Sequence, residues 1–199
     1  MRQYFALLPN IITLARIALV PPIAVLLLRE EYRPALGLIF VAGISDGLDG
    51  WLARMGGWRS RIGAALDPFA DKLLLVVSFA CLWWQGLLPT WLVAVVILRD
   101  VYLVLGGLIY NHWFERIELV EPSRISKINT FLQIGLALLV VVDAAWPMTL
   151  PDNVLFLMTR LVLFTTVVTF ADYAWTWSQR ARRVGLKRHH YSSHDSERS

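Results

Sequence analysis

The chain alternates long apolar runs with short polar connections. A transmembrane helix needs roughly 20 consecutive apolar residues, because it must cross about 30 Å of hydrocarbon. Six runs approach this length, and they cover Ile11–Leu28, Ala35–Ala53, Ala64–Leu87, Thr90–Tyr110, Ile128–Trp146 and Val154–Trp177. We therefore expect an all-α integral membrane protein, built as a bundle of six transmembrane helices with both termini on the same side of the membrane.

The first apolar run differs from a cleaved signal peptide. Only Arg2 precedes it as a basic residue, it contains Arg16 and the pair Pro21–Pro22, and it lacks a small-residue cleavage site. Proline has no amide hydrogen for the helical ladder, so the pair predicts a kink. We expect a retained helix that is kinked near the two prolines.

The composition also indicates a membrane protein. Hydrophobic residues make up 57% of the 199 residues and charged residues only 17%, whereas soluble domains carry about 25% charged residues. Nine tryptophans and six tyrosines add side chains that collect at membrane interfaces. The chain has a single cysteine, Cys81, in an apolar run. Because there is no second cysteine, an internal disulfide and a cysteine-based metal cluster are excluded.

The net charge of +4 comes largely from the segment 180–199. Attached to a hydrophobic bundle, a basic tail of this kind fits anionic lipid headgroups better than nucleic acid. The tail is polar and has no apolar period, so we expect it to be disordered. We therefore divide the chain into a six-helix transmembrane domain at 1–179 and a basic cytoplasmic tail at 180–199.

Basic residues predict the orientation of the bundle. Cytoplasmic connections of membrane proteins carry an excess of lysine and arginine. Outside the spans, Arg29 and Arg33 are the basic residues of one side. The other side holds many more, namely Arg2, Arg54, Arg59, Arg61, Arg116, Arg124, Lys127 and the tail residues. We expect this richer side, with both termini, to be cytoplasmic, and the membrane to be a bacterial inner membrane.

Four aspartates interrupt the second and third apolar runs. Asp46 and Asp49 are about 60° apart on a helix, so they share one face, and Asp67 and Asp71 align because they are four residues apart. Pro68 suits the first turns of the third helix, where its missing amide hydrogen has little effect. Two adjacent antiparallel helices therefore bring four carboxylates together near one membrane surface.

Carboxylates crowded in a low dielectric repel one another and take up protons unless cations neutralise them. Oxygen ligands without histidine or cysteine clusters favour Mg²⁺, Mn²⁺ or Ca²⁺ over zinc or copper. Arg54 lies on the face of Asp46 and can bind phosphate oxygens, while nearby small residues leave room for a ligand. Two alternative interpretations stay open. The small residues could serve close packing between membrane helices, and one or two of the aspartates could belong to a proton relay or an ion pathway.

The aspartate segment resembles a known family. The residues that match its pattern D-x2-D-G-x2-A-R-x8-G-x3-D-x3-D are Asp46, Asp49, Gly50, Ala53, Arg54, Gly63, Asp67 and Asp71. This pattern is the signature of the CDP-alcohol phosphatidyltransferases, and the resemblance covers most of the chain apart from the tail. It implies that residues 1–179 form a catalytic domain that uses CDP-diacylglycerol and an acceptor alcohol or phospholipid and releases CMP.

The resemblance also implies roles for these residues. Asp46, Asp49 and Asp67 would bind metal, Mg²⁺ or Mn²⁺ and two ions in all, and Asp71 would be the catalytic base that also touches a metal. The CDP pocket would be lined by Gly50, Ala53, Arg54 and Gly63. Members of the family often form homodimers.

Two other stretches add candidate residues. The segment "LPNIITLARIALVPP" resembles phosphatidylglycerophosphate and cardiolipin synthases of the family, in which Asn10, Thr13 and Arg16 could approach the nucleotide or phosphates. The alternatives are a helix cap for Asn10 and a snorkelling Arg16. A basic cluster could hold an acceptor phosphate, or its members could be interfacial anchors; it comprises Arg61, Lys72, Arg99, Arg124 and Lys127.

The pair "RDV" and "ISKINT" looks most like the CMP-forming cardiolipin synthases, whose acceptor is phosphatidylglycerol. Phosphatidylglycerophosphate synthases, which use glycerol 3-phosphate, usually have glutamate where this chain has Asp100 and tend to have lysine where it has Asn129. We therefore favour phosphatidylglycerol and keep glycerol 3-phosphate as the alternative. A cation or proton transporter, or a structural bundle with buried ion pairs, would leave the spacing of Arg54 and the glycines unexplained.

Overall fold

The computed structural model describes the backbone of residues 8–56, 61–113, 124–147 and 150–195 and the side chains of most residues between 13–45, 72–105, 125–147 and 150–176. The described residues form six helices and no strand. These helices are α2 (Leu8–Leu28), α3 (Tyr32–Gly56), α4 (Arg61–Trp84), α5 (Thr90–Trp113), α6 (Arg124–Ala145) and α7 (Asp152–Asp195). The all-α fold and the six helices predicted from the apolar runs are confirmed.

Two of these helices are long and apolar enough to cross a membrane when only the described residues are considered. They are the segments Ile125–Ala145 of α6 and Asn153–Thr176 of α7. Shorter apolar stretches occur at Thr13–Leu28, Tyr32–Ser45 and Lys72–Trp84. These shorter stretches begin at Thr13 and Lys72 or end at Ser45, which are also limits of the residues with described side chains, so six membrane crossings stay a prediction.

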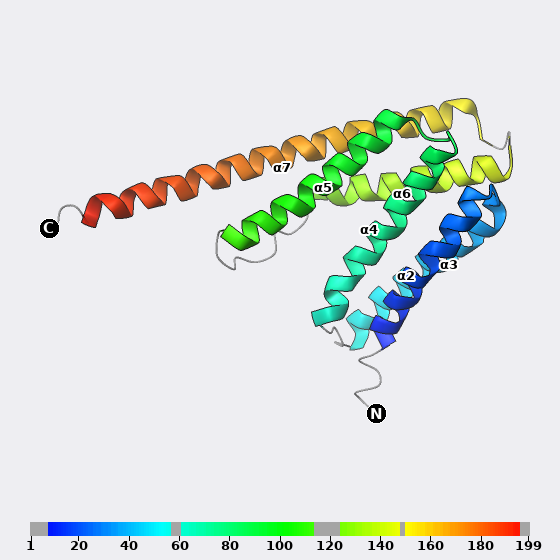
Figure 1. The fold of residues 1–199 in the computed structure, drawn as a ribbon, viewed down its shortest axis with the longest axis horizontal. Coiled ribbons are helices and arrows are strands. Elements are labelled where there is room, and N and C mark those ends of the chain that lie inside the picture. The colour runs from blue at the N-terminus through cyan, green and yellow to red at the C-terminus, as the bar shows by residue number, and fades with distance from the viewer. Residues whose placement is uncertain (1–7, 57–60, 114–123, 148–149, 196–199) are drawn as a thin grey trace.

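The helices pack in two connected groups (Figure 1). α2 packs along α3 and α4, α6 packs along α7, and α5 lies against α7. α3 and α4 also contact α6, which joins the groups. The core between them consists of fully buried apolar side chains, including Ile23, Leu27, Phe79, Leu82, Leu92, Leu136, Val141 and Val162.

Large apolar side chains also cover much of the outer surface. Phe40 on α3, Phe131 on α6 and Phe164 on α7 are each at least 65% exposed. Trp84 at the end of α4 and Trp175 on α7 are similarly exposed. Soluble monomers rarely expose apolar surface on this scale. The surface therefore fits a protein whose helices face lipid.

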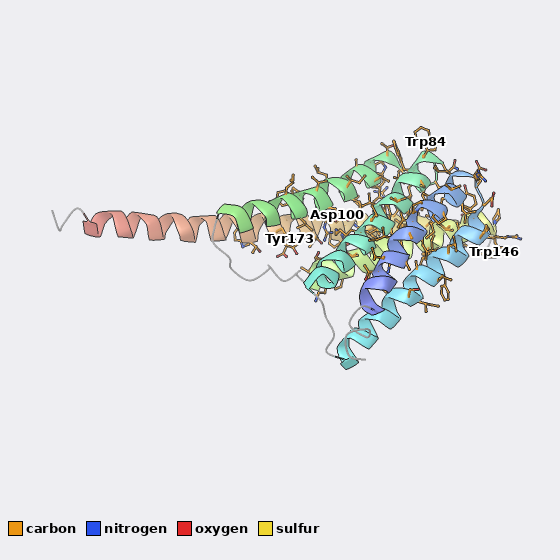
Figure 2. The ribbon with its side chains drawn as sticks, turned by 60° about the horizontal axis from the view of Figure 1, so that its bottom comes forward. Trp84, Asp100, Trp146 and Tyr173 are labelled. Carbon is orange, nitrogen blue, oxygen red and sulfur yellow. The ribbon has the colours of Figure 1, made fainter. Side chains whose placement is uncertain are left out.

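Three short connections lie at one end of the bundle, which we call the short-loop end. Their described residues are 29–31, 85–89, 146–147 and 150–151 (Figures 1 and 2). There the amide of Gln85 donates hydrogen bonds to the last carbonyl oxygens of α2, at 3.2 Å to Leu27 and 2.8 Å to Leu28. The oxygen of Leu27 also accepts a hydrogen bond from the backbone amide of Glu30 at 3.0 Å, whereas Leu28 is the last residue of the helix, where a carbonyl oxygen has no intrahelical donor. Gln85 thus caps α2 and fastens it to the end of α4.

Arg33 makes a similar connection between α3 and α6. Its Nε donates to the carbonyl oxygen of Ala145 at 3.2 Å, and its guanidinium lies 5.3 Å from the ring centroid of Trp146. On the neighbouring connection, Trp83 Nε1 donates to Thr90 Oγ1 at 2.9 Å. Side chains at the short-loop end therefore satisfy helix ends and bridge turns.

Two features of the helices differ from or extend the sequence-based expectations. α2 is assigned as one helix that contains Pro21 and Pro22, and the predicted kink is not tested by this assignment.

α7 continues to Asp195, whereas the sequence predicted a disordered tail after residue 179. The tail begins with the helix-forming residues "RARR" and extends a helix that is already nucleated, so adding each residue is easier than starting a helix.

Candidate active site

The four aspartates lie on the halves of α3 and α4 that face the 57–60 connection, and we call this end of the bundle the aspartate end. With a rise of about 1.5 Å per residue, Asp49 and Asp46 lie about 10 and 15 Å from the end of α3. Asp67 and Asp71 lie about 9 and 15 Å from the start of α4. The two pairs are therefore at matching depths. The side chains of all four are outside the described set.

Figures 1 and 2 show the start of α2, the end of α3 and the start of α4 together at this end of the bundle. The predicted CDP-binding residues are on the same segments. Gly50, Ala53 and Arg54 belong to α3, and Gly63 belongs to α4. Their side-chain surroundings, like those of Asn10 on α2, lie outside the described residues, so their roles stay predictions.

Thr13 and Arg16 of α2 are described, and both are almost completely buried at 1% exposure. Arg16 is about 12 Å from the start of α2, which is the depth of the aspartates. A snorkelling arginine would reach the surface, so this alternative for Arg16 is wrong. A buried guanidinium on a helix that packs against α3 and α4 adds positive charge at the level of the carboxylates.

A network of charged and hydroxyl side chains joins α4, α5 and α6 beside this region. Lys72 Nζ lies 2.5 Å from Asp100 Oδ1, and Arg99 Nη1 donates to the same oxygen at 2.6 Å. Arg99 Nη2 is 2.5 Å from Ser126 Oγ. Arg99, Asp100 and Ser126 are buried, whereas the Lys72 side chain is 37% exposed. The network begins at Lys72, which follows the predicted base Asp71 in the sequence.

The five predicted acceptor residues differ in their surroundings. It brings Lys72 and Arg99 together through Asp100, which neutralises one of their two charges. Lys127 is exposed on α6, one residue after Ser126. The side chains of Arg61 and Arg124 are outside the described residues. The predicted basic cluster is thus represented by two residues in direct contact with one shared carboxylate.

Polar side chains continue along the buried face of α6. Asn129 Oδ1 accepts hydrogen bonds from Thr165 at 2.8 Å and Thr166 at 3.0 Å, which connects α6 to α7. Gln133, one turn further, is fully buried. Within the described part of the chain, neither amide atom of Gln133 has a hydrogen-bond partner. Polar groups inside a membrane protein commonly mark interhelical contacts or bound water.

Ser126 is the member of the network that the sequence analysis missed. Its signal is its spacing, because Ser126, Asn129 and Gln133 follow one another at three and four residues and therefore share a helix face. A polar stripe within an apolar span marks the side that faces the protein interior. The stripe would have predicted the buried face of α6.

The metal prediction rests on the donor chemistry of the aspartates. Among the residues with described side chains, no group of three or more histidine, cysteine or acidic residues is placed to bind a metal. The four aspartates are not among those residues. Four carboxylates at matching depths, with no sulfur or imidazole donor in the motif, suit a hard divalent cation.

Comparison with known proteins identifies the sequence pattern. The family model described as CDP-alcohol phosphatidyltransferase matches residues 6–177. The chain is 34% identical over 200 residues to a CDP-diacylglycerol–glycerol-3-phosphate 3-phosphatidyltransferase 1, chloroplastic, of Oryza sativa subsp. japonica, covering 92% of this chain and 60% of that protein.

Cardiolipin synthases (CMP-forming) are also similar. The Rattus norvegicus protein is 30% identical over 195 residues, covering 89% of this chain and 62% of the relative. The Streptomyces coelicolor protein is 38% identical over 114 residues, covering 54% of this chain and 53% of the relative. The alignments thus span between about half and three fifths of each relative's length.

Proposed function

Because the chain belongs to the CDP-alcohol phosphatidyltransferase family, whose members are membrane-embedded and metal-dependent enzymes, we propose that it transfers a phosphatidyl group from CDP-diacylglycerol to an alcohol and releases CMP. The observation that carries the proposal is the family match over residues 6–177, which includes all eight motif positions. The placement of the aspartates supports it, since they lie at similar distances from the end of α3 and the start of α4, which Figures 1 and 2 show at the same end of the bundle.

The reaction needs a base and an electrophilic phosphorus. Asp71 takes the proton of the acceptor hydroxyl, and the acceptor oxygen attacks the phosphorus that bears the diacylglycerol. The bond between this phosphorus and the oxygen it shares with CMP breaks, and CMP leaves with the electron pair. Asp46, Asp49, Asp67 and Asp71 would hold Mg²⁺ or Mn²⁺ as two ions, which when bound neutralise the diphosphate and the developing charge on CMP.

The nucleotide and the acceptor occupy different parts of this arrangement. Gly50, Ala53, Arg54 and Gly63 line the CDP side, and Asn10 and Thr13 of α2 approach it from the neighbouring helix. Lys72 and Arg99 contact the acceptor phosphate, with Arg61, Arg124 and Lys127 as further candidates. The pairing of Lys72 and Arg99 at one carboxylate supports an anionic acceptor, because the two cations and Asp100 leave one net positive charge.

The leading acceptor is phosphatidylglycerol, which makes cardiolipin the product. The similarity of "RDV" and "ISKINT" to cardiolipin synthases favours it, as do the relatives from Rattus norvegicus and Streptomyces coelicolor. Glycerol 3-phosphate is the second candidate. It is favoured by the Oryza sativa relative, whose alignment covers 92% of this chain.

The membrane arrangement follows from the charge distribution. Both termini and the aspartate end face the cytoplasm, where basic residues are concentrated. CMP then leaves into the cytoplasm while the acyl chains stay in the bilayer. The membrane is a bacterial inner membrane, and the protein functions as a homodimer.

The test is turnover of radiolabelled CDP-diacylglycerol by the purified protein in detergent with Mg²⁺ or Mn²⁺. Phosphatidylglycerol and glycerol 3-phosphate are offered in separate reactions, with Asp71→Asn as the control. Cardiolipin formed with phosphatidylglycerol alone supports the leading acceptor, and phosphatidylglycerophosphate supports the second. Divalent-dependent ion flux without CMP release from any alcohol would overturn the proposal in favour of a transporter.

A further inference from the structure

Asp100 has one carboxylate oxygen that is crowded and one that is unused. Lys72 and Arg99 both contact Oδ1, at 2.5 and 2.6 Å. Oδ2 is buried and has no hydrogen-bond partner within the described part of the chain. A buried carboxylate oxygen without a donor is costly, because the lost hydration is not replaced. This oxygen is therefore a position where a ligand's hydrogen-bond donor would be stabilising.

Arg99 has a buried hydrogen-bond donor without an acceptor. Its Nη1 and Nη2 are occupied by Asp100 and Ser126, whereas its buried Nε has no acceptor among the described residues. The unused donor and the unused acceptor belong to two side chains that are themselves hydrogen-bonded. A ligand with a hydroxyl group and an anionic oxygen a few bonds apart satisfies both atoms together. A glycerol phosphate group has this chemistry.

Lys72 provides the means of access. Its side chain is 37% exposed, whereas those of Arg99 and Asp100 are 1% and 8% exposed. Lysine has a long, flexible stem, so Lys72 can leave Oδ1 for an incoming phosphate at less cost than the buried Arg99. Departure of Lys72 frees a face of the Asp100 carboxylate. It does so one residue away from Asp71, the proposed base.

We infer that Asp100 accepts a hydrogen bond from the second hydroxyl of the acceptor's glycerol group, and thereby directs the terminal hydroxyl toward Asp71. The inference rests on the proposed transferase function and applies to both candidate acceptors. Phosphatidylglycerol and glycerol 3-phosphate each carry a terminal hydroxyl that attacks and a neighbouring hydroxyl that does not react. Asp100 recognises the neighbouring hydroxyl, while Arg99 and Lys72 hold the phosphate.

A purely structural role for Asp100 makes a different prediction. If the carboxylate only neutralises Lys72 and Arg99, removing it changes the use of every anionic acceptor by the same factor, whether or not a second hydroxyl is present. The relative use of two acceptors that differ only in that hydroxyl therefore separates the two roles, because folding and charge effects cancel in the ratio.

The experiment compares each acceptor with its analogue that lacks the second hydroxyl. The pairs are glycerol 3-phosphate with 1,3-propanediol monophosphate, and phosphatidylglycerol with phosphatidyl-1,3-propanediol, so that the free phosphate and the lipid are tested separately. A hydrogen bond to a charged group predicts that the wild type favours the natural acceptor by roughly 10- to 100-fold in kcat/KM. In Asp100→Ala this preference falls to about twofold or less.

Ser126→Ala is the matched control, since it removes the other partner of Arg99 and leaves Asp100 in place. It lowers kcat/KM for both members of a pair and keeps their ratio at the wild-type value. Asp100→Asn retains an oxygen acceptor without charge and gives an intermediate ratio. An unchanged ratio in an active Asp100→Ala protein would overturn the inference while leaving the transferase proposal intact.

If Asp100→Ala does not fold, binding to the wild type decides the question. Glycerol 3-phosphate and its deoxy analogue are titrated separately against the protein without CDP-diacylglycerol, by calorimetry, after turnover has shown which acceptor is used. For a phosphatidylglycerol-specific protein, the lipid pair is titrated in mixed micelles. A preference of at least about tenfold for the hydroxylated ligand supports the inference, and equal affinities refute it. Absence of CMP with any alcohol refutes the transferase proposal instead.

Discussion

At the short-loop end, Gln85 and Arg33 donate hydrogen bonds to backbone carbonyl oxygens where α2 and α6 finish. Toward the aspartate end, charged side chains from α4 and α5 bind one another and Ser126 of α6, and some of their buried atoms are left without a partner in the described residues. The first arrangement satisfies the ends of helices and stabilises the bundle. The second leaves buried donor and acceptor atoms to which a ligand can form hydrogen bonds. The difference indicates which polar contacts serve the fold and which serve a ligand.

The largest effect should follow from loss of a carboxylate at the aspartate end. Asp67→Asn weakens metal binding, and metals supply several kcal/mol of charge stabilisation in such reactions, so CMP release should fall by at least about 100-fold. Chelation of the wild type should have the same effect and be reversed by Mg²⁺ or Mn²⁺. The unfolding temperature of Asp67→Asn should stay close to the wild-type value. A large loss of stability with normal turnover would show instead that Asp67 serves the fold and not a ligand.

A smaller effect is expected from Arg99→Lys. The guanidinium binds Asp100 and Ser126 through two nitrogens, and a single ammonium group cannot reproduce this geometry. We expect the KM for the acceptor to rise by about tenfold, because a hydrogen bond to a charged group is lost. The KM for CDP-diacylglycerol should be unchanged. Equal changes in the two KM values in steady-state kinetics would argue against separate donor and acceptor regions.

Gln85→Met tests the short-loop end. It keeps the length of the side chain but removes both hydrogen bonds to the last carbonyl oxygens of α2. We expect the free energy of unfolding to fall by about 1–2 kcal/mol in mixed-micelle denaturation. Because Gln85 is remote from the aspartates along α4, kcat/KM should be retained. A selective loss of acceptor use would show that the two ends are coupled.

The smallest expected effect is that of Arg33→Lys. The substitution keeps the charge and loses the fixed Nε hydrogen bond to Ala145, while part of the contact with Trp146 can remain. The free energy of unfolding should fall by about 0.5–1 kcal/mol, as expected for one hydrogen bond. Turnover should match the wild type, and the change can be read from the denaturation midpoint.

Much of the helical framework could be predicted from the sequence. Each described helix begins and ends within a few residues of its apolar run, except at the end of α7. Apolar runs define these helices well, because a backbone group in an apolar environment must be paired within its own helix. They define the end of α7 poorly, because the polar tail keeps helix-forming residues after the apolar pattern stops. Pairwise packing, such as α5 against α7, depends on shape and cannot be read from periodicity.

The candidate site shows the same division. Spacing alone aligned the aspartates on α3 and α4, because fixed steps along a helix determine a shared face. The contact of Lys72 with Asp100 joins residues on different helices, and it depends on how α4 and α5 approach. The role of Ser126 was missed for this reason, although its neighbours were named. The burial of Arg16 also required the packing of α2, since an arginine near a helix end can equally reach the surface.

α7 has a further consequence for where parts of the protein lie. Its 44 residues measure about 66 Å, whereas a bilayer with its headgroups is about 45 Å thick. An upright α7 is therefore longer than the membrane is thick, and Figure 1 shows it extending well past the other helices. The length of α7 thus limits how far its C-terminal end can lie from the lipid. With α7 upright across the membrane, we expect a probe attached near Asp195 to report on the aqueous phase beyond the lipid.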